Sequence, residues 1–244
     1  MKKTFLSLSV FALALSGVPA IANESASATT PRAERIGADK IGQKLGDAGV
    51  ESRADFKGKL VRAQTPEGHP VMFVFGPENL AGDEDIDFRQ DRVRGRLTEA
   101  AFSRLEFIDD ESIVRGELGD KAVLAFTAEH GWRGVTGPAE ASTPDADRLN
   151  ERLGEVGFED RESLDGSLLR ASSGGQSIFV LMGPQDFSGG GSVALSAKEL
   201  SDFQSAFENA ELIESVTLRR GTIGGQTVVA ISGSGIAPDV NTPR

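Results

Sequence analysis

The sequence predicts an α+β protein of two tandem αββαββ domains, each a four-stranded antiparallel sheet with two helices on one face. Three observations predict this fold. The chain contains a long internal repeat, each half of the repeat contains two helix-spaced apolar patterns, and each helix pattern is followed by two strand patterns joined by a tight turn. Runs of antiparallel strands with helices gathered on one face are typical of α+β domains.

The internal repeat relates residues 38–63 to residues 146–171 without a gap. Eleven of these 26 positions are identical, and the match returns later in the same order, for example at Ala101-Phe102 and Ala206-Phe207. Between the copies lies a stretch of proline, small and polar residues that is typical of a linker. We expect a signal peptide at 1–22, a disordered leader at 23–32, a first αββαββ domain at 33–134, a linker at 135–144, a second αββαββ domain at 145–236 and a disordered tail at 237–244.

The first residues have the parts of a secretory signal. Lys2 and Lys3 provide a positive start, a short apolar stretch follows, and Ala20-Ile21-Ala22 is a small-x-small cleavage site. The apolar stretch is too short and too rich in serine to span a membrane. We therefore expect an exported protein, periplasmic or secreted, that is not inserted in the membrane.

The composition of the chain excludes several kinds of partner, catalysis and metal site. The net charge of -11 disfavours nucleic acid as a partner, because the phosphates would be repelled. The chain has no cysteine, which excludes disulfides, thiol catalysis and cysteine metal ligands. We expect no cofactor and no metal, and a partner that is another exported or envelope protein.

Each of the four units begins with a helix pattern. In the first three units apolar residues recur at i, i+4 and i+7, which places them on one helix face. The fourth helix is less regular and begins with a capping box formed by Ser196 and Glu199. The apolar faces are Ile41, Leu45 and Ala48; Val93, Leu97 and Ala100; Leu149, Leu153 and Val156; and Leu200, Phe203 and Phe207.

Two strand patterns follow each helix, joined by turns that carry the glycine typical of hairpins. The second strand of each pair is apolar at nearly every position, whereas a strand with one covered face alternates. The far face of each sheet therefore needs a cover, which is either the other domain or a partner. The first strands centre on Leu60-Val61-Arg62, Ile113-Val114-Arg115, Leu168-Leu169-Arg170 and Leu218-Arg219-Arg220, and the second strands lie at 71–75, 122–126, 178–182 and 227–231.

The hairpin from Phe56 to Pro77 resembles that of PepSY-type domains, in which a helix precedes a strand, a glycine turn and an apolar strand. The closing turns, Gly76 to Gly82 and Gly183 to Gly189, have glycine where that family has aspartate. The tandem layout also resembles beta-lactamase-inhibitor-like proteins. Both resemblances imply non-catalytic exported modules, some of them enzyme inhibitors, and neither supplies site residues.

Four arginines occupy the same place in the four units, on the first predicted strands. They are Arg62, Arg115, Arg170 and Arg220. If they share a face, they form a basic row that could bind carboxylates bidentately, and they are the candidate ligand-binding residues. The alternative is structural: Glu51 and Glu159, or acids on the neighbouring helices, pair with the arginines while the arginine stems pack along the sheet.

Other residues give weaker signals of chemistry. His69 and His130, the only histidines, are predicted to lie exposed in a turn and at a strand end rather than to act as general bases. The acidic run from Asp83 to Asp87 lacks the glycine and glutamate of a calcium loop, which favours a solvated loop. Trp132 is a candidate interface residue, either filling a domain interface or anchoring a partner.

These observations predict a non-catalytic exported protein that binds or regulates a partner by protein–protein contact. An alternative is an inhibitor of an exported peptidase or other hydrolase. Another is a sensor of small anionic ligands that uses the four arginines. We expect no enzymatic activity, because no motif of a nucleophile, a metal protease or a phosphate loop is present.

Overall fold

The structure, a computed structural model, describes residues 36–77, 80, 85–108, 112–127, 146–188, 193–233 and 236. All of them fall within one compact unit that spans residues 33–244. The predicted signal peptide, leader, linker and tail lie outside the described residues, so the domain boundaries drawn from the sequence stay predictions.

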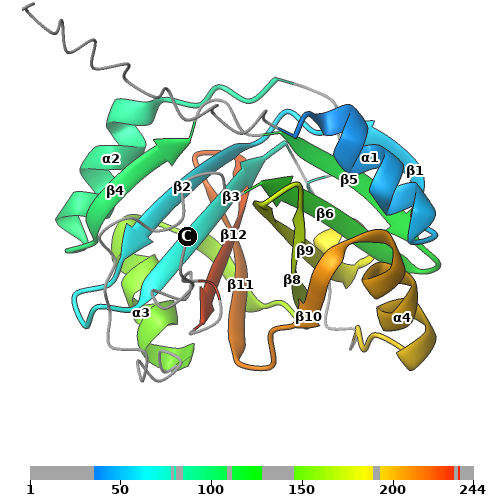
Figure 1. The fold of residues 1–244 in the computed structure, drawn as a ribbon. Helices are drawn as coiled ribbons and strands as arrows, with labels where there is room; N and C mark the ends of the chain where they lie inside the picture. The colour runs from blue at the N-terminus through cyan, green and yellow to red at the C-terminus, as the bar shows by residue number, and fades with distance from the viewer. Residues whose placement is uncertain are drawn as a thin grey trace, which may run out of the picture. The chain divides into compact units, whose positions relative to one another are not determined.

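The described chain repeats the order helix, strand, strand, strand four times (Figure 1). The predicted helices and hairpins are present, and each unit has one more strand than the sequence predicted. The elements are α1 (Ala38–Asp47), β1 (Glu51–Asp55), β2 (Lys59–Gln64), β3 (Pro70–Gly76), α2 (Gln90–Glu99), β4 (Ser103–Ile108), β5 (Ile113–Leu118), β6 (Lys121–Thr127), α3 (Ala146–Val156), β7 (Glu159–Ser163), β8 (Ser167–Ser173), β9 (Gln176–Pro184), the 3-10 helix η2 (Gln185–Phe187), α4 (Ala197–Ala206), β10 (Glu208–Leu212), β11 (Val216–Ile223) and β12 (Gln226–Gly233).

The strands form two six-stranded antiparallel sheets, which corrects the prediction of two four-stranded sheets. Sheet A has the order β1-β5-β6-β9-β8-β10, and sheet B has the order β4-β2-β3-β12-β11-β7. Each sheet takes three strands from each half of the repeat. The prediction of an α+β composition is correct, but the two halves do not each build a sheet of their own.

The first strand of each unit explains why the predicted sheets were wrong. In the first unit, β1 pairs with β5 in sheet A, whereas the β2–β3 hairpin lies in sheet B. Each unit is thus divided between the two sheets. Three of the first strands, β1, β7 and β10, are short and mostly exposed, so they lack the apolar pattern by which a strand is recognised in a sequence. The fourth, β4, alternates only briefly, at Leu105 and Phe107.

All four first strands are edge strands with the same irregularity. The second residue of each has a left-handed backbone, and the pairing register shifts at that place. Such a bulge increases the local twist, which keeps an exposed edge from pairing with another chain. The four residues are Ser52, Arg104, Asp160 and Asn209, with φ between 48° and 52°.

The inner faces of the two sheets pack against each other and form the central core. Leu124 and Leu181 of sheet A meet Val74 and Val229 of sheet B in one buried cluster. The central strands β3, β6, β9 and β12 are therefore covered on both faces, which accounts for their nearly continuous apolar sequences. The far face of each sheet is covered by the other sheet of the same chain. The sequence analysis expected the other domain or a partner there, but each sheet contains strands of both halves of the repeat.

The helices cover the outer faces, which makes a four-layer α/β/β/α arrangement (Figure 1). Helices α1 and α4 pack on sheet A, where Leu45 and Phe203 lie over Val180. Helices α2 and α3 pack on sheet B, where Leu97 and Leu153 share a cluster with Phe73. A sheet covered on both faces needs no further partner for its apolar side chains.

The strand orders show that the repeat is also a symmetry of the fold. Replacing every strand of sheet A by its equivalent in the other half of the repeat, so that β1 becomes β7 and β5 becomes β11, produces sheet B in reverse order. Exchanging the second unit with the third, and the first with the fourth, maps sheet B onto itself. The four units are therefore topologically equivalent, and equivalent places in the molecule can be compared directly.

Candidate functional site

The four arginines predicted as a row are divided between the two sheets. Arg62 and Arg220 lie in sheet B, whereas Arg115 and Arg170 lie in sheet A. Each stands two residues after a residue of the central core, so strand alternation places all four toward the inner faces of the sheets, beside that core. They do not form a single basic row on one surface.

Three of these arginines bind a carboxylate of the neighbouring edge strand. Arg220 Nη1 lies 2.9 Å from Glu162 Oε1, and Arg170 Nε donates to Glu211 Oε1 at 2.7 Å. Arg62, whose side chain is 3% exposed, lies 3.4 Å from Glu106. In the strand register, Arg115 stands opposite Ala54, whose side chain carries no carboxylate.

The acids that bind these arginines are not the predicted Glu51 and Glu159. They stand three residues later in their units, beyond the bulge, on strands that the sequence did not reveal. The pairs connect strands of different units, which favours the structural alternative. The ligand-binding role of Arg62, Arg115, Arg170 and Arg220 stays a prediction.

A second recurrent feature is a junction between each helix and a hairpin turn of another unit. Helix α1 faces the β8–β9 turn, α2 faces the β11–β12 turn, α3 faces the β2–β3 turn, and α4 faces the β5–β6 turn. The symmetry of the strand orders makes these four junctions equivalent. The side chains that fill them differ, and the difference defines the candidate site.

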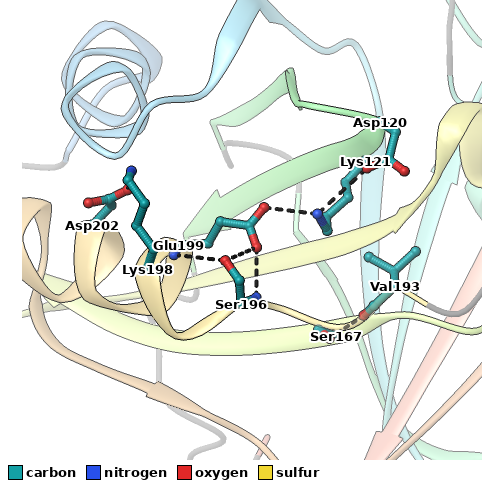
Figure 2. A network of polar contacts seen from close by, with 8 residues as sticks. All are labelled: Asp120, Lys121, Ser167, Val193, Ser196, Lys198, Glu199 and Asp202. Carbon is teal, nitrogen blue, oxygen red and sulfur yellow. Dashed lines mark hydrogen bonds and ion pairs between the residues drawn. The ribbon is translucent and has the colours of Figure 1, made fainter.

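The junction of α4 is closed by an ion pair and a capping box (Figure 2). Lys121 Nζ lies 2.8 Å from Glu199 Oε1, and Ser196 and Glu199 cap the helix reciprocally, which confirms the predicted capping box. The hydrogen bond from Lys121, followed by those from Ser196, lowers the pKa of Glu199 to about 2. The same hydrogen bond raises the pKa of Lys121. This network fastens a helix of the second half of the chain to a strand of the first half.

The junction of α3 is closed by Glu67 of the β2–β3 turn. Its carboxylate lies 3.3 Å from Arg148 Nε and 3.6 Å from Arg152 Nη2. Burial acts to raise the pKa of Glu67, but hydrogen bonds from its own backbone and from Thr65, together with the charges of Arg148 and Arg152, outweigh burial and lower that pKa. One acid thus occupies the space between two basic residues spaced i, i+4 on the helix.

The junction of α1 is closed without an ion pair between helix and turn in the residues that the structure covers. The backbone N–H of Ile36 donates to Gln176 Oε1 at 2.7 Å. Lys44 Nζ donates to the backbone oxygen of Ala206 at 2.6 Å and lies 5.6 Å from the centre of the Phe207 ring.

The junction of α2 is not closed by any side chain of the described residues. A hollow of about 430 Å³ lies between the start of α2 and the β11–β12 turn. Its basic wall is formed by Arg89, Arg92 and Arg96, and the turn opposite consists of Gly224 and Gly225, both with a left-handed backbone. A glycine turn brings backbone, but no side chain, to the hollow.

Within the described residues, two of these arginines are left without an ion pair. Arg89 is bound by Asp87 at 3.0 Å, and Asp85, another lining residue, is bound by Lys57 at 3.1 Å. Arg92 and Arg96, which face the hollow from successive turns of α2, have no recorded ion pair. They are the candidate ligand-binding residues.

The remaining predicted residues do not join this site. His69 lies in the β2–β3 turn as predicted, but it is half-buried, and its backbone N–H donates to Thr65 Oγ1. His130 and Trp132 lie outside the described residues. Among the described residues, no group of three or more histidine, aspartate or glutamate side chains is arranged to hold a metal ion.

The sequence analysis did not predict that Arg92, Arg96 and the glycine turn facing them form a candidate site. The basic pair was visible, because Lys40/Lys44, Arg92/Arg96 and Arg148/Arg152 occupy the same places before and between the apolar helix residues. What the sequence could not show was which turn faces which helix, since each helix faces a hairpin of a different unit.

Comparison of the chain with protein-family models, curated proteins and solved structures found no match. The resemblance to PepSY-type domains therefore stays a prediction. What the structure defines is a class of architecture: a four-layer α/β/β/α protein of four αβββ units. Of the helices that the structure describes, none has the length and apolar character needed to cross a membrane.

Proposed function

We propose that this protein is an exported, non-catalytic binding protein that acts by contact with another exported or envelope protein. The observation that carries the proposal is that, among the described residues, one of the four junctions is left open. Three equivalent junctions are closed by Gln176, Glu67 and the Lys121–Glu199 pair, whereas the fourth presents arginines to solvent. Because the four junctions are equivalent in the fold, the unfilled space at α2 supports binding of a partner at that junction.

The displaced pKa values support a role in contact rather than in a reaction. Perturbed groups often mark catalytic sites. In this protein the described groups with a shifted pKa each belong to an ion pair with a structural explanation. They are Glu67, Lys121, Arg152, Lys198 and Glu199.

The surface favours a polar, reversible contact. Among the described residues the only exposed large hydrophobic side chain is Leu212, at 40% exposure. Permanent interfaces are usually large and apolar, while transient ones are smaller and more polar. A partner would therefore be recognised by charge and hydrogen bonding, and its binding would weaken as salt rises.

The proposal is tested by comparing captured partners rather than by capture alone. The wild-type protein and an Arg92→Gln/Arg96→Gln variant serve as baits for cross-linking in an envelope extract, with an Arg94→Gln variant as control. Arg94 lies over the Phe107 ring at 4.4 Å and is not part of the hollow. We expect a partner that the wild type and the control retain and the double variant loses. Failure of the wild type to retain any partner, or hydrolytic activity that His69→Ala abolishes, would contradict the contact function. Equal capture by all three baits would contradict only its placement at the α2 junction.

A second candidate function is the sensing of a small anionic ligand. The volume of the hollow lies within the range of small-molecule sites, and its arginines supply positive charge. Thermal unfolding in the presence of anionic metabolites distinguishes the two functions. A sensor is stabilised by one small anion, whereas a protein-binding module is not.

A further inference from the structure

The α2 and α3 junctions can be compared most directly, because both belong to the same sheet. Both helices lie on sheet B, and the symmetry that maps this sheet onto itself exchanges α2 with α3 and the β11–β12 turn with the β2–β3 turn. Aligning Val93 with Leu149 also aligns Arg92 with Arg148 and Arg96 with Arg152. The two junctions therefore present the same pair of guanidinium groups to equivalent turns.

The two junctions differ in what the turn supplies. In the β2–β3 turn, Glu67 brings a carboxylate within 3.6 Å of both arginines. In the β11–β12 turn, Gly224 has no side chain, and an added Cβ would meet no atom within 4 Å. At the α3 junction the internal carboxylate lies beside both arginines, whereas at the α2 junction the hollow lies beside them.

From this comparison we propose that the hollow between α2 and the β11–β12 turn binds a carboxylate through Arg92 and Arg96, in the place that Glu67 occupies beside α3. The inference deepens the proposed function and rests on it, since it names the contact surface and the chemistry of the ligand. The carboxylate comes either from an acidic peptide segment or from a small dicarboxylate.

The position of Arg96 supports binding with little rearrangement. Its Nη1 atom lies 3.1 Å from the place that a Cβ on Gly157 would take, so its guanidinium group is held against the end of α3. A side chain that is already positioned loses less entropy when a ligand binds. Arg92 is exposed and Arg96 is half-buried, so water and salt will screen the interaction.

The overall charge of the protein makes the hollow selective. The chain carries -11, so an anion is repelled from most of the surface and attracted only where positive charge gathers. Of the described residues, the two acids that line the hollow are Asp85 and Asp87. Each is bound to a basic residue, Lys57 or Arg89, which reduces their competition for Arg92 and Arg96.

The experiment is a titration at low ionic strength followed by NMR of the arginine side chains. The probes are a blocked tetraglutamate peptide, succinate, inorganic phosphate and, as a neutral control, a blocked tetraglutamine peptide. Arg92→Gln/Arg96→Gln is the loss variant. Arg94→Gln removes a charge from the same helix but not from the hollow.

A gain variant tests the place of the carboxylate directly. Gly224→Asp creates an Asp-Gly turn, which suits a two-residue hairpin and the left-handed backbone, and puts an internal acid at the hollow. The matched control is Gly174→Asp in the β8–β9 turn, which has the same Gly-Gly-Gln sequence, a φ of 58° and equally open space. Circular dichroism confirms that each variant is folded.

We expect tetraglutamate or succinate to shift the resonances of Arg92 and Arg96, with about tenfold weaker binding in the double arginine variant. Gly224→Asp should abolish binding, while Arg94→Gln and Gly174→Asp retain it. Binding of the peptide alone indicates a protein segment as the source, and equal binding of succinate indicates a free dicarboxylate.

Other results would overturn the inference. These are no binding of either carboxylate, tighter binding of phosphate, equal weakening by Arg94→Gln, or undiminished binding by Gly224→Asp. Failure of the site and failure of the function can be told apart. Partner capture that survives the loss of Arg92 and Arg96 refutes this site only, whereas carboxylate binding without any partner refutes the contact function only.

Discussion

Substituting Glu199 by glutamine tests how the helices are fastened to the sheets. Glu199 accepts a hydrogen bond from Lys121 at 2.8 Å and caps α4 together with Ser196 (Figure 2). Its side chain is 20% exposed, so solvent screens the ion pair only in part. Glutamine keeps the size of the side chain and removes its charge.

The size of the effect follows from the pKa of Glu199. A pKa of about 2, against 4.5 for the free group, corresponds to about 3 kcal/mol in favour of the ionised form in the folded state. The raised pKa of Lys121 reports the same interaction from the other partner and is not added. We expect Glu199→Gln to lower the free energy of unfolding by about 2–3 kcal/mol at pH 7.

The pH dependence gives the prediction its sign. Because the folded-state pKa of Glu199 is depressed, its contribution is complete above about pH 4.5 and is lost as the pH falls through about 2. The difference between wild type and variant should therefore shrink over this range. Urea unfolding followed by far-UV circular dichroism between pH 7 and pH 2.5 measures it.

A matched control lies one turn further along the same helix. Asp202 accepts a hydrogen bond from Lys198 at 2.6 Å, but the Lys198 side chain is 83% exposed, so Asp202→Asn should leave stability almost unchanged. A loss below about 0.5 kcal/mol for Glu199→Gln at pH 7, or a loss that does not vary with pH, would refute the assignment of this ion pair as a structural fastener.

Four further substitutions test the core, helix α2 and the edge strands by urea unfolding. Gly58→Ala should destabilise the protein by about 1–3 kcal/mol, because the new Cβ would lie 2.7 Å from the backbone oxygen of Phe75. Gly95→Ala, in the open interior of α2, should stabilise the protein by about 0.5–1 kcal/mol. Similar effects of the two substitutions would contradict the close packing around Gly58. Leu181→Ala in the central core should cost about 2–5 kcal/mol, and a smaller loss would mean that the sheets are not closely packed there. Ser52→Val should cost about 1 kcal/mol or more, because Ser52 has a φ of 49°, and an unchanged stability would argue against the bulge.

The sequence predicted the local elements well because their signals are local. The helix faces of Leu45, Leu97 and Leu153 are buried as predicted, and the turns at Gly174-Gly175 and Gly224-Gly225 join hairpins. The burial of the second strands on both faces was also visible, since their sequences do not alternate. Each of these inferences needs only a window of a few residues and a known period.

The assembly of these elements could not be predicted because it depends on exposed strands. β1 has the sequence Glu-Ser-Arg-Ala-Asp, which contains no apolar alternation, yet its pairing with β5 decides that the units exchange strands. The same exchange carries Glu106 to Arg62 and Glu162 to Arg220, so the partners of the arginines were hidden with it. The edge strands pair through backbone hydrogen bonds, and such pairing cannot be predicted from the hydrophobicity of the side chains.

The open junction is compatible with a stable fold because the junctions contribute little to folding compared with the layers they join. The ion pair between Arg148, 64% exposed, and Glu67 is of the kind that contributes at most about 1 kcal/mol. The layers, in contrast, are held by the burial of residues such as Phe73, Leu124 and Phe203. A glycine in place of the acid at the α2 junction therefore leaves the core intact. The same guanidinium pair that fastens α3 is available at α2 for a carboxylate from outside the chain.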